Sequence, residues 1–379
     1  LDVTNEKIQY MYCIQCGAEL PVGEYPLGCP DCLNKGHPSS LTFKYKENLK
    51  ILPMKKGMKR YISMLPVDDF ISLGEGATPV VEIPRLAEEI GIRNLYVKCE
   101  FQNPTGSHKD RMNPLIVTRA KEMGYSKIVA ASSGNEGISL ACYAAANEIS
   151  CSIVVTDAIA SHWKKAIETT GAELIIAKDS MSRWKLIREE METENWFSAT
   201  NVNVPPVGSC CFGVQGYKTI SYEIFEEMKD DIPEYILIPT SRGDLLWGIY
   251  EGFQDLIDAE KIKEMPRLVA VEPFPRLEKV RSLDECIKQF EGNSQNTPSI
   301  GGNTVTVQSY LALKNSNGYA ISVPASYVGI SVSELARNGL YLETSSALSV
   351  AGLKKLVKEK KITENSKALL IATSYGFKN

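Results

Sequence analysis

From about residue 70 to the C-terminus, short apolar segments alternate with segments of helical pattern, and Gly-rich turns separate several of them. The apolar segments are NLYVKCE, KIVAASS, SCSIVVT, ELIIAK, YILIPT, RLVAVEP and ALLIATS. The helical segments are PLIVTRAKEMG, GISLACYAAANEI, WKKAIETTG, GYKTISYEIFEEM and SALSVAGLKKLVKEK. Short continuous apolar strands between helices are typical of a parallel sheet that is buried on both faces. The pattern therefore predicts an α/β fold, with ligands at the carboxyl ends of the strands.

Composition narrows the class of protein further. The chain has 379 residues, of which 44% are hydrophobic and 23% charged, so it is long enough for two or three domains and is not disordered. Its net charge is −4, whereas nucleic-acid binders are usually basic. No apolar run approaches the ~18 residues that span a bilayer, and the first residues do not read as a signal peptide. We expect a cytoplasmic protein that binds neither nucleic acid nor a membrane.

The ten cysteines are of two kinds. Six are scattered, and we expect them to be reduced thiols in a cytosolic chain. The other four form two C-x2-C pairs that are separated by twelve residues, namely Cys13, Cys16, Cys29 and Cys32. Two such turns can close a tetrahedral site, so the spacing predicts a structural Zn²⁺ in a zinc-ribbon-like module. Two disulfides, or a ribbon without metal, are the alternatives, and a ribbon can also bind a partner.

Four turns carry residues suited to chemistry. In the first, at 103–111, Lys109 stands at the opening of a helix, where a partly buried lysine can form a Schiff base. Most lysines at helix starts are simply solvated, so the motif alone leaves both interpretations open. In the second, at 132–137, backbone N–H groups at a helix start form an anion site. A tight strand-to-helix turn would explain its glycines but not Asn135.

The third and fourth turns also follow apolar strands. Residues 239–244 precede a helix and could hold a phosphate among backbone amides, although the turn has one glycine beside Arg242 and Asp244. Residues 372–378 follow the last strand and offer hydroxyl groups at the same sheet edge.

Together and in this order, these segments resemble the fold type II pyridoxal-phosphate enzymes, and within them the threonine synthases and their paralogues. LGEGATPV resembles "EGxTPL", NPTGSHKDR resembles "NPTGSFKDR", SSGNEG resembles "SSGNTG" and TSYGFK resembles "TGxGLK". SIGGNTVT and GLYLETSSALSVAGLKKL are similar to late segments of the group. The resemblance implies a tryptophan synthase β-like fold with two open twisted sheets, and an N-terminal Cys ribbon occurs in some members.

The resemblance also implies roles for individual residues. Lys109 would form the Schiff base with pyridoxal 5'-phosphate and carry the proton at the substrate α-carbon, with Asn135 on the phenolic oxygen. Thr373 would face the pyridine nitrogen. The cofactor phosphate would lie on Ser241, Arg242, Gly243 and Asp244. The substrate would contact Thr78, Ser132, Ser133 and Gly134. His108 stands where a Phe is usual, and we expect it to pack beside the ring.

The sequence departs from threonine synthases at two places. Glu136 replaces a Thr near the reacting side chain, where it would bind substrate or act as a general acid or base. The segment 204–219 lacks the Arg that grips the phosphate of phosphohomoserine. We expect a paralogue that performs elimination or replacement on another amino acid, one with a basic or hydroxyl side chain. Threonine synthase proper, a β-replacement synthase, a dehydratase and a non-catalytic PLP-binding regulator are the alternatives.

We expect three domains. Residues 1–44 form the ribbon module, residues 45–100 with 203–379 a large PLP-binding domain, and residues 101–202 a small mobile domain that closes over substrate. The resemblance also implies a homodimer.

Overall fold

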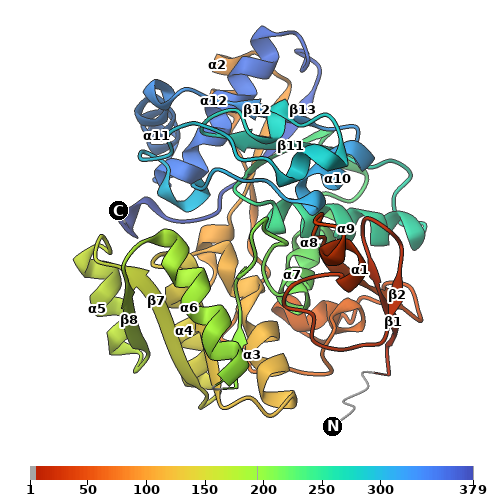
Figure 1. The fold of residues 1–379 in the computed structure, drawn as a ribbon. Helices are drawn as coiled ribbons and strands as arrows, with labels where there is room; N and C mark the ends of the chain where they lie inside the picture. Colours follow the sequence, from red (N-terminus) through yellow and green to blue (C-terminus); the bar gives the residue numbers. More distant parts are fainter. Residues whose placement is uncertain (1–5, 194, 379) are drawn as a thin grey trace. The chain divides into compact units, whose positions relative to one another are not determined.

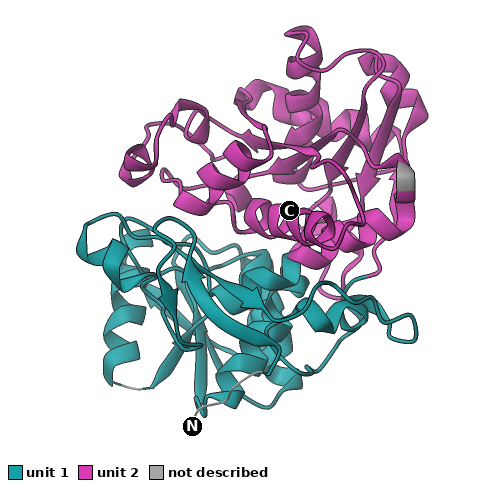
Figure 2. Ribbon diagram, turned by 90° about the vertical axis from the view of Figure 1, so that its right-hand side faces the viewer, with its two compact units in different colours: residues 1–76, 109–217 teal, residues 77–108, 218–379 magenta. Residues whose placement is uncertain are grey.

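A computed structural model describes residues 6–193 and 195–378, and it divides the chain into two compact units (Figures 1 and 2). Unit 1 comprises residues 1–76 and 109–217, and unit 2 comprises residues 77–108 and 218–379. Residues 1–5, 194 and 379, which fall within the expected domains, lie outside the described residues.

Unit 1 begins with a small antiparallel sheet that carries the two Cys pairs. Its strand order is β2-β1-β3, with β1 at Ile8–Cys13, β2 at Glu19–Leu20 and β3 at Leu41–Tyr45. The short helix α1 (Pro30–Asn34) follows the second Cys pair and has Pro30 in its first turn, where a missing N–H costs nothing. Phe43 of β3 packs edge-on against Phe212, with 4.8 Å between ring centroids, so the module is anchored within its unit.

The second sheet of unit 1 is parallel and has the order β8-β7-β6-β9. Its strands are β6 (Lys127–Ala130), β7 (Ser150–Thr156), β8 (Glu173–Ala177) and β9 (Trp196–Ser198). Its helices are α3 (Asn113–Glu122), α4 (Asn135–Ala146), α5 (Ser161–Thr169), α6 (Ser180–Thr193) and α7 (Cys211–Val214). Each connection from strand to parallel strand passes through a helix, as parallel pairing requires.

Unit 2 contains a six-stranded sheet of order β12-β11-β10-β13-β5-β4, in which only the edge strand β4 is antiparallel. The strands are β4 (Val80–Glu82), β5 (Asn94–Lys98), β10 (Tyr235–Pro239), β11 (Arg267–Glu272), β12 (Tyr319–Ser322) and β13 (Lys367–Ile371). The helices are α2 (Pro84–Ile90), α8 (Lys218–Met228), α9 (Asp244–Asp258), α10 (Val307–Asn315), α11 (Val328–Arg337) and α12 (Thr344–Lys358).

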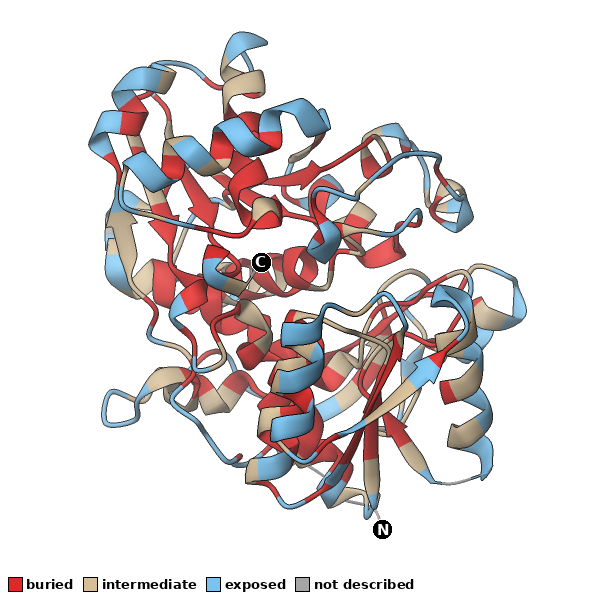
Figure 3. Ribbon diagram, turned by 90° about the vertical axis from the view of Figure 1, so that its left-hand side faces the viewer, coloured by how far each residue is buried: buried red, intermediate tan, exposed pale blue. Residues whose placement is uncertain are grey.

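Both faces of the central strands are buried (Figure 3). Alternate residues such as Leu237, Val269 and Leu370 join one core with Leu348 and Leu353 of α12. The residues between them in sequence point to the opposite face and are also buried. The predicted α/β fold with two open sheets is therefore confirmed, and every apolar or helical segment named from the sequence contains the expected element.

The compact units do not follow the expected domain boundaries. Residues 45–76 and 203–217, which were assigned to the large domain, belong to unit 1 with the ribbon. The units are defined by contacts and not by independent folding, so the three-domain division stays a prediction. In the part of the chain that the structure describes, no helix is both long enough and apolar enough to cross a membrane.

Candidate functional site

Lys109 lies beside a buried carboxylate. It belongs to the 3₁₀ turn His108–Arg111, directly before α3. Its Nζ is 3.4 Å from Glu136 Oε2, and the two side chains are 22% and 7% exposed. The Tyr217 ring, which is fully buried, has its centroid 6.0 Å from the same Nζ. The two motifs that the sequence analysis identified separately thus meet in unit 1 as an ion pair.

The turn between β6 and α4 places Glu136 and the expected substrate loop. Ser132, Ser133 and Gly134 are half-buried, whereas Asn135 at the start of α4 is buried. A Cβ added at Gly137 would come within 2.5 Å of Ser132 O, so only glycine allows the turn to close this tightly. The sequence analysis placed Ser132, Ser133, Gly134 and Asn135 together at the start of one helix, and the structure confirms this placement. Their roles in binding stay predictions.

One face of α4 is held by polar contacts that the sequence analysis did not identify. The Asn113 side chain, oriented with its NH2 toward α4, donates to Glu136 Oε1 at 2.9 Å. Three residues along the helix, Ser139 Oγ donates to Asp110 Oδ1 at 2.6 Å. One turn further, Tyr143 donates to Glu75 Oε2 at 2.7 Å, and burial raises the pKa of this phenol above its ordinary value. These contacts fix the rotation of α4 about its axis.

Unit 2 carries the expected phosphate turn at the carboxyl end of β10. Gly243 has φ +86°, and a Cβ there would lie 2.4 Å from Ser309 Cβ, so glycine is required. Ser241 Oγ donates to Gly301 O at 2.6 Å. Thr306 donates its hydroxyl to Arg242 O at 2.5 Å, and Gln308 donates to Asp244. The turn therefore contacts a second loop, 301–306, which the sequence analysis noted only as part of a resemblance.

Thr373 lies at the same edge of the unit 2 sheet, because its strand β13 is the parallel neighbour of β10. Its hydroxyl shares a hydrogen bond with Ser346 Oγ, and the Ser374 N–H donates to that serine at 3.0 Å. His108 donates its backbone N–H to Thr373 O at 3.0 Å. Ser346 is a residue that sequence reasoning missed, although the segment TSSALS was noted.

Thr78 is buried near the carboxyl end of β5, because Val80 of the edge strand β4 is paired with Lys98. It donates to Glu100 Oε1 at 2.6 Å, and Asn103 donates to the other carboxylate oxygen at 2.9 Å. Lys98 donates to Thr78 O and is paired with Glu223 at 2.9 Å. The Thr78 hydroxyl is thus committed to a structural hydrogen bond, and its expected contact with substrate stays a prediction.

The segment 204–219, where the phosphate-binding Arg was expected and not found, lies against the turn of Lys109. A Cβ at Gly216 would overlap Arg111 O, at 1.8 Å, so the two backbones are in close contact. Tyr217 comes from this segment. Three cations of α5 and α6 could replace the charge of the missing Arg: Lys164 and Lys165 are exposed, whereas Arg183 is half-buried and burial lowers the pKa of its guanidinium.

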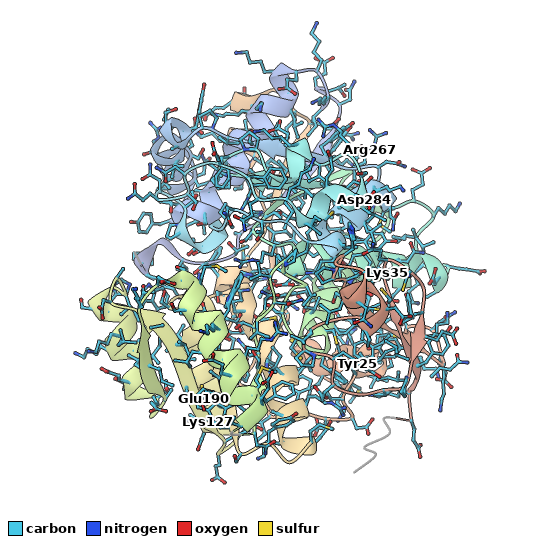
Figure 4. The ribbon with its side chains drawn as sticks, in the orientation of Figure 1. Tyr25, Lys35, Lys127, Glu190, Arg267 and Asp284 are labelled. Atoms are coloured by element: carbon cyan, nitrogen blue, oxygen red, sulfur yellow. The ribbon has the colours of Figure 1, made fainter. Side chains whose placement is uncertain are left out.

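The four ribbon cysteines converge. Their sulfurs all lie within 4.8 Å of one another. Cys13 and Cys32 have their Sγ atoms 3.7 Å apart, and Cys16 and Cys29 have theirs 3.8 Å apart. These separations far exceed the ~2.05 Å of a disulfide, so the disulfide alternative does not apply here. Tyr25, between the two pairs, donates its hydroxyl to Pro21 O at 3.1 Å (Figure 4).

Comparison with known proteins gives consistent results. A family model described as "Pyridoxal-phosphate dependent enzyme" matches residues 71–374. The threonine synthase of Methanocaldococcus jannaschii is 30% identical over 383 residues, covering 97% of this chain and 92% of that protein. The threonine synthase of Methanosarcina acetivorans is 29% identical, covering 98% and 92%. The solved structure of threonine deaminase isoform 2 from Solanum lycopersicum has a TM-score of 0.67 at 19% identity, covering 78% of each chain.

Proposed function

This chain belongs to the pyridoxal-phosphate dependent enzyme family and is similar along nearly its whole length to threonine synthases, and from this premise we propose that it catalyses elimination or replacement at an amino-acid side chain. Its fold is that of the fold type II enzymes of this family. The proposal concerns the reaction and its substrate, which the family leaves open.

The residues present fit pyridoxal 5'-phosphate. When bound, the cofactor supplies an electron sink for the bond that breaks. Lys109 is partly exposed and would link to it, and Asn135 at the start of α4 would donate to its phenolic oxygen. Gly243, where a side chain would not fit, keeps the phosphate turn in its tight form with Ser241, Arg242 and Asp244. Thr373 offers a hydroxyl at the same sheet edge for the pyridine nitrogen.

The observation that carries the proposal is the ion pair between Lys109 and Glu136. A lysine that shuttles a proton needs a group that accepts or returns it, and Glu136 Oε2 lies 3.4 Å from Nζ. The Asn113 amide holds the other carboxylate oxygen, so the carboxylate is already oriented. The pair therefore supports proton transfer at the substrate α-carbon or at its leaving group.

The same pair argues for a substrate other than phosphohomoserine. A carboxylate at 7% exposure would repel a substrate phosphate, and no Arg in the segment 204–219 compensates for that repulsion. Tyr217, from that segment, places an uncharged aromatic ring near Lys109. We propose a substrate whose side chain carries a basic or hydroxyl group that Glu136 can bind.

The experiment is a visible spectrum of the purified protein with pyridoxal phosphate, followed by a panel of amino acids. The panel contains phosphohomoserine, phosphoserine, threonine and basic hydroxy-amino acids. We expect an absorption band that is absent in Lys109→Ala and that shifts with a non-phosphorylated substrate. Phosphate release from phosphohomoserine would instead make the chain a threonine synthase proper. No band with added cofactor would contradict the enzyme proposal and favour a non-catalytic role.

Glu136→Thr tests the choice of substrate. This variant restores the residue that threonine synthases carry, so turnover of the true substrate should fall. Unchanged kinetics on every substrate of the panel would refute the role of Glu136. Glu168→Thr in α5 of the same unit, which makes the same substitution at an exposed glutamate paired with Lys164, is the matched control.

We also propose that Cys13, Cys16, Cys29 and Cys32 hold a structural Zn²⁺. Four sulfurs at about 2.3 Å from a tetrahedral zinc are about 3.8 Å from one another, and the observed 3.7 and 3.8 Å agree with this value. Four thiolates would complete the tetrahedral coordination of the zinc, so the site would have no open position for a reacting molecule. A structural role follows from this closed donor set.

Metal analysis and chelation test the zinc proposal. We expect about one zinc per chain, and its removal should lower the thermal stability of the protein. Cys13→Ser with Cys29→Ser should remove the metal, whereas Cys151→Ser, a buried thiol elsewhere in unit 1, should retain it. Full metal content in the double variant would refute the assignment.

The homodimer is likewise a proposal that rests on the resemblance to this group. Analytical ultracentrifugation of the purified protein checks it, with a single species at about twice 41.9 kDa as the expected result.

A further inference from the structure

A fully buried ion pair lies behind the proposed phosphate turn. Glu272, the last residue of β11, and Arg276 are both 0% exposed, with Arg276 Nε 3.1 Å from Glu272 Oε1. The carboxylate also accepts three backbone N–H groups, from Arg276, Leu277 and Glu278, at 3.3, 3.1 and 3.1 Å. Its acceptor capacity is thereby used, and Glu272 holds the guanidinium in one orientation.

The other side of the guanidinium joins two loops. Nη2 donates to Thr240 O at 2.8 Å, in the proposed phosphate turn. Nη1 donates to Gly302 O at 2.7 Å and to Gly301 O at 3.3 Å, in the second loop. Ser241 Oγ, which donates to the same Gly301 O, is a second link between the loops. One buried cation therefore fixes three carbonyl groups from two segments that are 60 residues apart.

The orientation of these carbonyls determines where the neighbouring N–H groups point. In a trans peptide the C=O and the following N–H point in opposite directions. Because the carbonyls of residues 240, 301 and 302 face Arg276, the N–H groups of Ser241, Gly302 and Asn303 point away from it. Within the described residues, none of these three N–H groups has a hydrogen-bond partner.

The surroundings favour an anion in front of these N–H groups. Gly302 and Asn303 are exposed, so a ligand can reach them. A Cβ at Gly302 would lie 3.2 Å from Arg242 Nη2, which places a cation beside the loop. The two loops lead into the N-termini of α9 and α10, where the helix dipoles are positive.

We infer that Ser241, Gly302 and Asn303 form one phosphate-binding site through their backbone N–H groups, and that Arg276 is its positioning residue. The inference rests on the proposed function, because the ligand is the phosphate group of the cofactor. The loop 301–303 thereby gains a binding role beside the turn 241–244, and Arg276 acts on the phosphate through both loops without touching it.

The test compares pyridoxal phosphate with pyridoxal, which can react with Lys109 but has no phosphate. Both are titrated into the apo protein, and the absorption band gives each affinity. In Arg276→Lys the affinity for pyridoxal phosphate should fall roughly tenfold or more, the effect of losing a charge-assisted hydrogen bond. The affinity for pyridoxal should stay within about twofold of the original protein. Inorganic phosphate should compete with pyridoxal phosphate in the original protein and lose that effect in the variant.

Two further variants keep the test decisive. Arg267→Lys changes an arginine at the opposite end of the same strand, where its guanidinium donates to the Tyr319 hydroxyl at 2.9 Å (Figure 4), and should alter neither affinity. Ser241→Ala removes only the second link between the loops, so it provides the same comparison if Arg276→Lys does not fold. We expect a smaller loss of the same selectivity.

Equal losses for both ligands, or no loss for either, would overturn the inference while leaving the proposed function intact. A changed KM for phosphorylated substrates alone would assign the site to a substrate phosphate and also overturn it. If the original protein gives no Lys109-dependent band, the proposed function fails, and the cofactor assignment of this site fails with it.

Discussion

The two units each bury a carboxylate against a cation, and the two pairs differ in how completely they are bonded. In unit 2, Glu272 accepts four N–H donors and Arg276 donates to three carbonyls, and neither side chain is exposed. In unit 1, Glu136 is held by an amide and by Lys109, which is 3.4 Å away and retains 22% exposure. A fully bonded pair fixes a scaffold, whereas a looser pair that reaches solvent leaves a group available for chemistry.

The largest expected effect separates the two pairs by function. Lys109→Ala should abolish the cofactor band and reduce turnover at least ~10³-fold, because the residue that would link to the cofactor and move the proton is lost. Absorbance and steady-state kinetics measure both quantities. Lys127→Ala, which removes a lysine ion-paired with Glu173 at 3.0 Å in the same unit, should leave both unchanged. Retained turnover in Lys109→Ala would show that the ion pair of unit 1 is not catalytic and does not differ in this respect from the ion pair of unit 2.

The next prediction compares how much the two ion pairs contribute to the stability of the fold. Glu272→Ala should lower the free energy of unfolding by about 3–5 kcal/mol, because it leaves a buried guanidinium uncompensated. Glu136→Gln should cost less than Glu272→Ala, because Lys109 retains 22% exposure and its charge can be hydrated when the carboxylate is removed. Urea unfolding of the apo protein measures both. Equal losses would show that the two pairs are equally structural.

A kinetic effect of intermediate size sharpens the role of the acid in unit 1. Glu136→Gln keeps the shape and the contact with Asn113 but removes the charge, so kcat should fall roughly 10²-fold. The pH profile of kcat should lose one ionisation, which a purely structural residue would not cause. A fall in kcat with an unchanged profile would argue against proton transfer by Glu136.

The smallest effect concerns an uncharged pair. Ser346→Ala removes the partner of the Thr373 hydroxyl and leaves the Ser374 N–H without its acceptor, which should cost about 1–3 kcal/mol of stability. Thermal unfolding measures the loss, and the cofactor band should remain. Loss of the band in this variant would move the pair from support to direct cofactor binding.

Sequence patterns predicted the elements better than the contacts between them. Apolar strands between helices predicted parallel pairing, which holds in both larger sheets except at the edge strand β4, because burial on two faces leaves a clear pattern. Lys109 and Glu136 were each identified from a turn, but their 3.4 Å contact depends on how α4 packs beside the 3₁₀ turn. Asn113 was missed because its position reads as an ordinary helix start before Pro114.

Arg276 shows why other residues could not be predicted. Its spacing of four from Glu272 suggests a helical pair, yet the two residues span a strand end and a turn. Arg276 donates to the carbonyl groups of both Thr240 and Gly302. These residues lie in loops that follow different strands of the sheet, so no local sequence pattern predicts that they are close. The unit boundaries were missed for the same reason, because they depend on contacts that are distant in the chain.

The polar face of α4 has a consequence for how such an enzyme changes its specificity. Ser139 and Tyr143 set the rotation of the helix through Asp110 and Glu75, independently of the side chain at position 136. Whatever residue stands there is delivered to the same place beside Lys109. Under the proposed function, an exchange at position 136 would therefore change the group that meets the substrate while the contacts that orient α4 stay in place.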